Sequence, residues 1–473
     1  MILTDNPFEH SVSEKPNREL LIATWGDPAK WSEAKYLIGG KEYGHCTSLI
    51  PILLSMRERV ETGEVNLVII VLESLIDYNP SGTIGGSSSF CRTCVEECSG
   101  ILEKARESGS YAEIRSRISE FIEKVYNCLL EKYGIALSVQ PRVIVAPAIG
   151  SPAGNWRFIG GLKDFESIVL KELGDFLLST KYSKIIVDLT HGINFMPSLT
   201  MRLIPRLASI LLLRHPELSS VEAVVYNSDP YPLKRNGTPL LNINEAYRET
   251  LETIQLIHSI PHLTELLDRF KTDEHALQVY KKANKLSNEI LFGVVKHIYK
   301  SLYYPLPLAL CYFTSPDDCK SLDKVSSIIK DVLDSVRIVR NGSNGTIERP
   351  VSIEPDAVYA YLISKAVCER INEMTDSTSG SITKRGWSLE FLEKSVAPIY
   401  KKVHKAFETL IKHEISKLGD KVGPPRYRGG SQCNPDNRIM VAHAGFQNGC
   451  IDVSDGLVKY IKDPEEIFES LKL

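Results

Sequence analysis

The stretch DNRIMVAHAGF, residues 436–446, places Arg438 five positions before His443, with Asn437 directly before the arginine. A neutral histidine can remove the proton of a ribose 2′-hydroxyl or, once charged, protonate a leaving 5′-oxygen. An arginine can hold the phosphate between these groups and stabilise the negative charge of the transition state. These residue types together predict RNA cleavage that needs no metal ion.

The spacing alone is weak evidence for this chemistry. On a helix, Arg438 and His443 would lie about 140° apart around the axis. They would meet only at a bent helix end, or if each chain of a dimer supplied one set. Asn437 or Asp436 could cap the start of the helix. A surface arginine beside a helix-terminal histidine is therefore the simplest alternative.

A second group of polar residues follows a buried strand, in VDLTHGINFMP at 187–197. Backbone N–H groups are free where a chain leaves a sheet and starts a helix, and the helix dipole favours an anion there. A glycine at such a position would let a ligand approach the backbone closely. The candidate ligand-binding residues here are Thr190, His191, Gly192, Ile193 and Asn194.

Three other strand ends carry small, polar or aromatic residues. They are Trp25, Gly26 and Asp27 in TWGDP, the segment AIGSPAGNW at 148–156, and NSDP at 227–230. Ligands of open α/β sheets bind beyond the carboxyl ends of the strands, so we expect these loops to line a pocket for a nucleotide-like ligand. The sequence has no GxGxxG after the first strand and no GxxxxGK[ST], which argues against NAD, FAD and P-loop chemistry. Ordinary turn formation would account for the same residues.

The elements that must position these loops alternate in the first half of the chain. Apolar runs rich in Val and Ile predict buried strands at 19–26, 65–74, 141–150, 183–192 and 221–230. Helical patterns lie between them, at 47–60, at about 92–133, and from Lys163 and Pro197 onward. Such alternation indicates a mostly parallel sheet with helices on both faces. We therefore predict an α/β, Rossmann-like domain over residues 17–245.

From about residue 245 the pattern becomes mostly helical. Helices are predicted at 246–270, 274–302, 321–339, 355–374 and 387–417. Segments rich in Gly, Ser and Asn at 340–350 and 374–388 indicate exposed loops. We therefore predict an all-α domain over 271–473, joined to the sheet by a connecting helix at 246–270 that carries conformational change between the halves.

Composition and charge limit the classes of function. A net charge of −3 gives no overall field that would attract nucleic acid, so any RNA contact needs a local patch. The N-terminal MILTDNPFEHSVSEKPN lacks the features of a signal peptide, and no apolar run approaches the roughly 18 residues of a membrane span. These features predict a cytoplasmic protein that does not bind a membrane.

The ten cysteines would ordinarily be reduced thiols in such a compartment, although hyperthermophile proteins are an exception. Cys91, Cys94 and Cys98 in CRTCVEEC contain a CxxC step, but no second pair completes four zinc ligands. We predict no metal site, and three small residues on a helix that begins near Arg92. A zinc module or a disulfide there is the alternative.

An N-terminal Rossmann-like half with DLTHGINFMP, followed by a helical half that ends in NRIMVAHAGF, resembles the CARF–HEPN ribonucleases of type III CRISPR systems. The resemblance covers nearly the whole chain in architecture, and DLTHGIN is its most specific element. It implies that the CARF half dimerises and binds a cyclic oligoadenylate, most often cyclic tetra-adenylate. It also implies a dimeric, composite HEPN site that cuts single-stranded RNA without a metal cofactor and leaves a 2′,3′-cyclic phosphate.

Carried onto this sequence, the resemblance makes Arg438 and His443 the catalytic pair. The messenger would contact Thr190, His191, Gly192 and Asn194, with the loop of Trp25, Gly26 and Asp27 as a second wall. The family commonly has a polar residue directly after the arginine, whereas this chain has Ile439 there and Asn437 before it. Asn437 is therefore a candidate catalytic residue without a matching motif position.

A CARF-type regulator or binding protein without nuclease activity is the alternative function. Such a regulator should carry a compact helix-turn-helix unit with a basic recognition helix. Lys and Arg are instead scattered in the second half, as in KKVHKAF and GPPRYRGG. The ribonuclease is therefore the favoured hypothesis.

Overall fold

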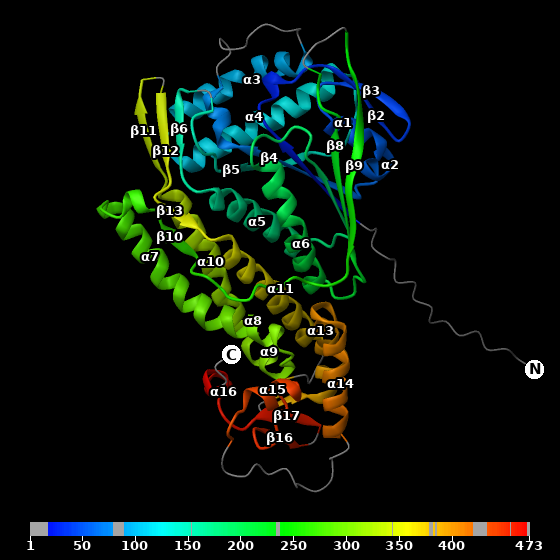
Figure 1. Ribbon diagram of the computed structural model, residues 1–473, viewed down its shortest axis with the longest axis vertical. Coiled ribbons are helices and arrows are strands. Elements are labelled where there is room, and N and C mark those ends of the chain that lie inside the picture. The colour runs from blue at the N-terminus through cyan, green and yellow to red at the C-terminus, as the bar shows by residue number, and fades with distance from the viewer. Residues whose placement is uncertain are drawn as a thin grey trace, which may run out of the picture.

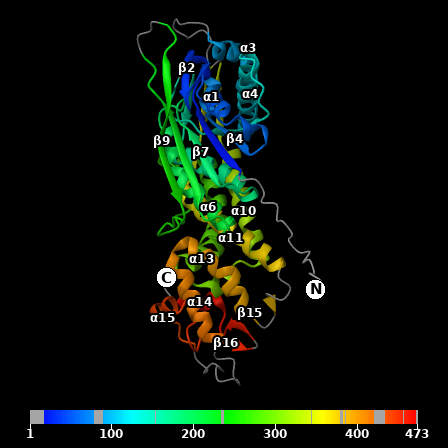
Figure 2. The ribbon, with the colours of Figure 1, turned by 90° about the vertical axis from the view of Figure 1, so that its right-hand side faces the viewer.

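The largest sheet of this computed structural model has eight strands among the described residues, in the order β3-β2-β9-β8-β7-β1-β4-β5. The described residues are 18–78, 89–152, 154–232, 237–342, 344–377, 382–383, 386–419, 433–454 and 456–470. Residues 1–17, part of the predicted loop at 374–388 and the segment GPPRYRGG at 423–430 lie outside them. The large sheet occupies one end of an elongated molecule, helices fill the middle, and a small sheet lies at the other end (Figure 1). A view turned by 90° shows the same order along the long axis (Figure 2).

The five strands that the sequence predicts form the parallel centre of the large sheet. They are β1 (Glu19–Trp25), β4 (Val65–Leu72), β5 (Pro141–Ala146), β7 (Lys184–Asp188) and β8 (Val221–Ser228). β1 pairs in parallel with β4 on one side and with β7 on the other. The chain runs outward from β1 to β5 and then returns to β7, so the strand order reverses between β1 and β7. Ligands of such sheets bind at this reversal, beyond the carboxyl ends of the strands.

The sheet is mixed rather than wholly parallel, because three further strands join it at one edge. β2 (Ala34–Ile38) and β3 (Lys41–His45) form a hairpin, and β9 (Leu240–Leu251) runs antiparallel to β8. The predicted connecting helix at 246–270 is therefore wrong, since it begins inside β9 and includes β10 (Thr264–Leu266). Most residues of β9 are exposed.

Helices cover both faces of the large sheet (Figure 1). α3 (Phe90–Glu107) and α4 (Tyr111–Lys132) pack together on one face. α5 (Leu162–Ser179) and α6 (Met196–Arg214) pack on the other face and against α11 (Pro355–Ser377) of the second half. The layer of α5 and α6 thus lies between the sheet and the helical half.

Two predicted helices are each interrupted. The helix expected over 92–133 is divided at Ser110, whose side chain accepts a hydrogen bond from the N–H of Glu113 and so caps α4. The helix expected over 47–60 is α1 (Leu49–Ser55) followed by α2 (Arg57–Glu61). Ser48 precedes α1 but makes no capping hydrogen bond, because its hydroxyl is used elsewhere.

α6 is long and apolar enough to cross a membrane, which contradicts the expectation that no such run exists. Pro197 lies in its first turn, as predicted, where no backbone N–H is needed. Within the fold, 61% of the apolar window is buried, because the helix packs against the sheet, α5 and α11. The apolar composition is therefore that of a core helix.

The second half is mainly helical, as predicted. α7 (Glu274–Ile290) continues through a π-helical turn into α8 (Lys296–Tyr303), and α10 (Pro316–Asp334) packs beside α7 and α11. α13 (Ala397–Val403) and α14 (Lys405–Gly419) follow along the chain. These helices lead from the large sheet to the C-terminal end of the molecule (Figure 1).

Strands also occur in the second half, so the expected all-α class is wrong in detail. The predicted loop at 340–350 contains most of a hairpin of β11 (Arg337–Asn341) and β12 (Asn344–Glu348). β12 pairs in parallel with β6 (Trp156–Ile159) of the first half. A small sheet at the C-terminal end joins β14 (Ile382–Thr383), β15 (Gly386–Ser388), β17 (Leu457–Tyr460) and β16 (Ile451–Ser454).

A buried ion pair fixes the joint between the halves. Arg349, just past β12, donates hydrogen bonds to the carboxylate of Glu73 and to the hydroxyl of Tyr111, and all three residues are nearly fully buried. Removing one partner of such a pair leaves an unpaired buried charge, which costs about 3–5 kcal/mol. Sheet pairing and this ion pair together make a firm connection.

Eight of the cysteines form disulfides, contrary to the expectation of reduced thiols. The pairs are Cys46–Cys91, Cys94–Cys128, Cys319–Cys368 and Cys433–Cys450. The predicted helix near Arg92 is α3, but Cys91 and Cys94 on it bond to cysteines of two other segments. Among the described residues no cluster of His, Cys, Asp or Glu could hold a metal ion.

Candidate functional site

A cavity of about 550 Å³, called here the sensor cavity, lies at the carboxyl ends of β7 and β8. Its walls come from the turns that follow β1, β7 and β8 and from the faces of β2 and β9. The lining residues are Lys30, Trp31, Ser32, Tyr36, Thr190, His191, Asn227, Ser228, Asp229, Pro230, Tyr231, Pro232 and Leu241. The cavity thus lies beside the reversal of strand order between β1 and β7.

His191 forms part of the wall of the sensor cavity as a neutral ring. Its Nε2 accepts a hydrogen bond from the N–H of Ser48 at 3.2 Å and lies 3.3 Å from the hydroxyl of Tyr36. Because the backbone N–H can only donate, Nε2 is the acceptor and the ring proton is on Nδ1. Burial lowers the pKa of His191 to about 3. The ring therefore shapes the cavity and carries no charge near neutral pH.

A buried carboxylate beneath the cavity ties three segments together. Asp188, at the end of β7, accepts hydrogen bonds from the hydroxyl of Ser48 at 2.7 Å and from the N–H of Thr190 at 3.1 Å. Burial raises the pKa of Asp188, although these hydrogen bonds oppose the shift. The hydroxyl of Thr190 accepts a hydrogen bond from the N–H of Ser228, the last residue of β8, at 3.1 Å. Sensor-cavity residues are thus held in place before any ligand binds.

Two glycines of the predicted site pack the loops against each other. Gly26 donates its N–H to the carbonyl of His191 at 2.8 Å, and a Cβ on Gly26 would lie 2.5 Å from Cγ2 of Ile193. A Cβ on Gly192 would lie 2.5 Å from Oγ1 of Thr24. Both glycines thus permit close packing of the strand ends, whereas the sequence suggested that Gly192 faces a ligand.

The other predicted ligand residues do not line the sensor cavity. Trp25 is fully buried, and its ring meets that of Trp31 edge-on at 5.1 Å. Asp27 caps the short helix of residues 28–30 by accepting from the N–H of Ala29. Asn194 is exposed, with a φ of 51° in the left-handed region. The loop at 148–156 follows β5 at the far edge of the sheet, and none of its described residues lines the cavity.

Sequence reasoning missed the aromatic walls of the sensor cavity. Trp31 stacks on His191 with ring centroids 4.3 Å apart, and Tyr36 and Tyr231 line the same space. Lys30 adds a mostly exposed cation at the rim. The sequence signal for these walls was the run of aromatic and basic residues directly after TWGDP. The prediction considered only the residues at the strand end itself.

The opening motif of the C-terminal end forms a short helix, α15 (Asn437–Ala442). Asp436 caps it by accepting a hydrogen bond from the N–H of Ile439 at 2.9 Å, so Asn437 is left exposed in the first turn. The helix ends at His443, because Ala444 and Gly445 both adopt positive φ, 51° and 80°. A non-glycine residue there is strained, and such strain concentrates at functional sites.

His443 opens onto a cavity of about 310 Å³, called here the His443 cavity. Nδ1 of His443 lies 3.0 Å from Oε2 of Glu414 on α14. The other oxygen of that carboxylate, Oε1, lies 2.6 Å from Nζ of Lys417. Burial favours the neutral acid, but the hydrogen bonds from Lys417 and His443 prevail and lower the pKa of Glu414. The other lining residues are Leu418, Ile439, Phe446, Gln447, Asn448 and Ile451.

Arg438 is exposed and does not line the His443 cavity. It makes no ion pair with the part of the chain that the structure describes. One chain therefore does not bring Arg438 and His443 into a common cavity, in agreement with their expected separation around a helix.

The segment that carries α15 is closed into a loop at its base. Cys433 and Cys450 form a disulfide with a sequence separation of 17. The side chain of Gln447 accepts from the N–H of Asp436 at 2.9 Å and donates to the carbonyl of Asn434 at 2.8 Å. These three links hold the two ends of the segment together.

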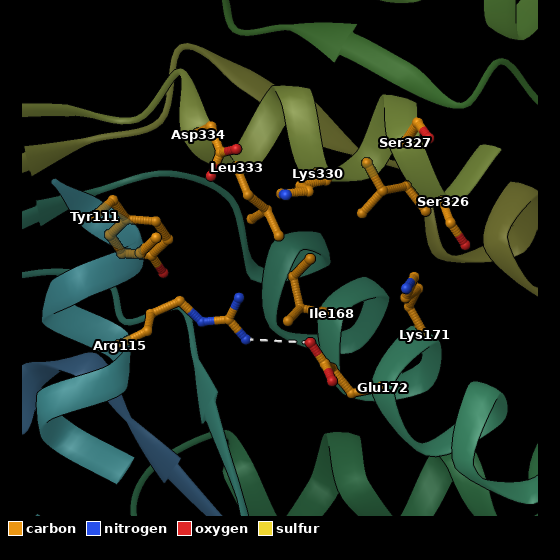
Figure 3. A pocket seen from close by; sticks show the side chains of 12 residues that line it. Tyr111, Arg115, Ile168, Lys171, Glu172, Ser326, Ser327, Lys330, Leu333 and Asp334 are labelled. Carbon is orange, nitrogen blue, oxygen red and sulfur yellow. Dashed lines mark hydrogen bonds and ion pairs between the residues drawn. The ribbon is translucent and has the colours of Figure 1, made fainter. Parts of the chain in front are cut away.

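A third cavity, of about 410 Å³, lies between α4, α5 and α10 (Figure 3). Arg115 reaches Glu172 at 3.4 Å across it, and Lys171 pairs with Asp175 at 2.6 Å. Lys330 points into the space from α10 (Figure 3). Arg115 and Lys171 are paired with carboxylates here, as Lys30 is with Asp27 in the sensor cavity. The third cavity has one aromatic ring in its lining, against three in the sensor cavity, so it is a weaker candidate for binding a nucleotide.

Comparison with known proteins adds an independent line of evidence. Residues 20–230 match the protein family described as the CARF domain of the CRISPR system endoribonuclease Csx1. The chain is also 24% identical over 461 residues to the CRISPR system endoribonuclease Csx1 of Methanocaldococcus jannaschii, an alignment that covers 92% of this chain and 86% of the relative. Residues 20–230 are therefore similar to the Csx1-type CARF domain, and most of the chain is similar to a CRISPR system endoribonuclease.

Proposed function

We propose that this chain is an endoribonuclease that a cyclic oligoadenylate, cyclic tetra-adenylate, activates. The nucleotide binds in the sensor cavity, and single-stranded RNA is cut at the His443 cavity without a metal cofactor. The observation that carries the proposal is the half-exposed His443 ring, hydrogen-bonded to a buried carboxylate inside a cavity. The M. jannaschii relative is itself named an endoribonuclease, which supports the same activity here.

The chemistry is an internal transfer that consumes no water. A neutral His443 accepts the proton of a ribose 2′-hydroxyl, the 2′-oxygen bonds to phosphorus, and the bond from phosphorus to the 5′-oxygen breaks. A protonated histidine returns a proton to that 5′-oxygen, so the products are a 2′,3′-cyclic phosphate and a 5′-hydroxyl. Two histidines, one from each protomer of a dimer, supply the base and the acid in one step.

A dimer also accounts for the position of Arg438. In one chain its side chain is exposed and lies outside the His443 cavity. We infer that the HEPN-type domains pair so that arginine and histidine of two protomers form one site, with Asn437 beside Arg438. An arginine that holds the phosphate in this site stabilises the charge of the transition state.

The sensor cavity has the chemistry that a cyclic oligoadenylate needs. Trp31 and Tyr231, both partly exposed, offer aromatic faces on which adenine rings can stack. Lys30 at the rim offers a cation for phosphate. A ligand with two-fold symmetry can bridge two such cavities across a dimer axis.

β9 gives a physical route between the two sites in place of the expected helix. Leu241 at its start lines the sensor cavity, and Leu251 ends it near the helical half. Just beyond, Glu252 pairs with Lys405 at 3.2 Å, at the start of α14. Since α14 also carries Glu414, a shift of β9 would reach the hydrogen-bond partner of His443.

The test is cleavage of single-stranded RNA by purified protein with EDTA present, with and without cyclic tetra-adenylate. We expect cleavage only with the nucleotide, and a loss of about 10²–10⁴-fold for His443→Ala. Ends should carry 2′,3′-cyclic phosphates. Nucleotide binding without any RNA cleavage would contradict the proposal and would support a regulator without nuclease activity.

A further inference from the structure

We propose that Glu414 is the positioning residue of His443, and that Lys417 is the cation which meets the RNA phosphate in the same cavity. The inference rests on the proposed function and extends it to two residues on α14. No spacing pattern pointed to them, because Glu414 lies 29 positions before His443 in the sequence. Packing of α15 on α14 brings them together.

The burial of the three groups separates their roles. The Glu414 side chain is 8% exposed, whereas those of His443 and Lys417 are 47% and 45% exposed. One carboxylate oxygen lies 3.0 Å from Nδ1 of His443, and the other lies 2.6 Å from Nζ of Lys417. The carboxylate is therefore the buried support, while the imidazole and the ammonium face the cavity that RNA would enter.

This geometry fixes which ring nitrogen does the chemistry. A carboxylate can only accept hydrogen bonds, so Nδ1 of His443 donates to it and carries the proton. Nε2 has no partner among the residues that the structure describes, so its lone pair is available to a 2′-hydroxyl. When Nε2 takes that proton, the ring becomes a cation beside the charge of Glu414, which stabilises it.

Lys417 has two consequences for the same site. Its hydrogen bond helps to keep the pKa of Glu414 low against the effect of burial, so the support stays charged. Its ammonium lines the His443 cavity, whereas Arg438 of the same chain does not. An anion that enters the cavity beside His443 therefore meets Lys417, a compact point charge that suits a phosphate.

Glu414→Ala tests the positioning role. We expect kcat for RNA cleavage to fall about 10–100-fold, the loss typical when a hydrogen-bond partner of a functional histidine is removed. The KM for RNA should stay within about twofold, because the residue does not touch the substrate. Glu414→Asp should recover part of kcat, because it restores the carboxylate.

A matched control lies on the same helix. Glu408 pairs with Lys412 at 2.7 Å and lines no part of the His443 cavity. Glu408→Ala removes an ion pair from α14 but should leave both kinetic constants near those of the unchanged protein. Equal rates for Glu414→Ala and Glu408→Ala would overturn the positioning role.

Lys417→Ala should give the opposite kinetic pattern. Loss of a phosphate contact raises KM about 10-fold and makes binding of RNA less dependent on salt, by roughly one charge. Lys412→Ala, which removes a cation of the same helix outside the cavity, is its control. A Lys417→Ala protein with unchanged KM and salt dependence would overturn the phosphate contact.

A second readout separates this inference from the proposed function. In nitrogen-15 histidine spectra, the Nδ1 proton of His443 should be shifted downfield by its bond to Glu414. That signal should vanish in His443→Ala and Glu414→Ala and persist in Glu408→Ala. If the signal follows this pattern but no RNA is cut, the proposed function fails alone. If RNA is cut by a protein in which His443 is essential but Glu414→Ala is fully active, the inference fails alone.

Discussion

The two cavities use histidine in opposite ways. His191 is partly buried in the wall of the sensor cavity, its Nε2 accepts a hydrogen bond from the backbone N–H of Ser48, and desolvation of the ring lowers its pKa to about 3. His443 is 47% exposed and rests on a carboxylate. A histidine held neutral by burial can shape a binding surface, whereas one that is open to substrate and backed by a carboxylate can exchange protons.

The carboxylates of the two cavities differ in the same sense. Asp188 receives hydrogen bonds only from neutral groups, Ser48 and Thr190, and burial raises its pKa. Burial also favours the protonated form of Glu414, but the hydrogen bonds from Lys417 and His443 prevail and lower the pKa of its carboxyl group. The carboxylate at the sensor cavity is thus held by neutral donors, while the carboxylate at the His443 cavity is held by a lysine and a histidine.

The largest effect that we expect is the effect of Arg438→Ala on RNA cleavage. In one chain Arg438 lies outside the His443 cavity. If one chain formed the whole site, loss of Arg438 would therefore not change the rate of RNA cleavage. In a composite dimeric site, we expect cleavage to fall about 10²–10³-fold, the effect of removing one electrostatic donor. Binding of cyclic tetra-adenylate should not change.

Mixing the variants sharpens this prediction. Each homodimer of Arg438→Ala or His443→Ala lacks both copies of one component of the shared site. A mixed dimer has one arginine and one histidine on different chains, so it regains activity only if residues of two chains act in one site. Subunit exchange followed by RNA cleavage measures the recovery, and full activity of Arg438→Ala alone would disprove its role.

The next effect concerns the disulfide that closes the segment around α15. Replacing Cys433 and Cys450 by serine removes a loop closure worth about 3 kcal/mol in the chain-entropy account. We expect RNA cleavage to be lost at a lower temperature than nucleotide binding, because only the His443 cavity depends on this loop. Replacing Cys94 and Cys128, which join α3 to α4, should leave heat inactivation of RNA cleavage closer to that of the unchanged protein.

The sensor cavity is tested by replacing Thr190 and His191 with alanine. Loss of the ring removes the acceptor of the Ser48 N–H and the stacking surface of Trp31. An unpaired buried donor costs about 1–3 kcal/mol, so the thermal midpoint should fall and activation should need more cyclic tetra-adenylate. Titrating the nucleotide against RNA cleavage measures this, and unchanged activation would show that the cavity is assigned wrongly.

The parallel centre of the fold could be predicted because its strands are buried on both faces. Continuous Val and Ile runs such as VNLVIIVL at Val65–Leu72 leave little other interpretation. The prediction of a helix at 246–270 missed β9, because this strand is exposed over much of its length and carries charges at positions that also fit a helix. The prediction missed β11 and β12 because the residues at their hairpin turn, such as Gly342 with a φ of 61°, also suggest a loop.

The candidate sites show a similar limit. Thr190 and His191 could be placed at the sensor cavity, because the carboxyl end of a parallel strand has a known role. Trp31 and Tyr36 could not, because β2 reaches that cavity by pairing with β9, about 200 residues later in the chain. Glu414 could not be predicted from the sequence for the same reason, since only tertiary structure brings α14 to His443.

The smallest effect is a pH dependence of stability that His191 contributes. Its pKa is about 3 in the folded chain and about 6.5 when unfolded. Below pH 6.5 the unfolded chain therefore binds a proton that the folded chain does not, so stability is present at higher pH and falls as pH falls. The contribution lost by pH 5.5 is about 1.4 kcal/mol. His191→Asn has no ring to titrate, so the free-energy gap between the two proteins in urea unfolding should shrink by that amount between pH 7.5 and 5.5. A gap that stays constant would mean that His191 is not held neutral, and the contrast between the two histidines would then not rest on burial.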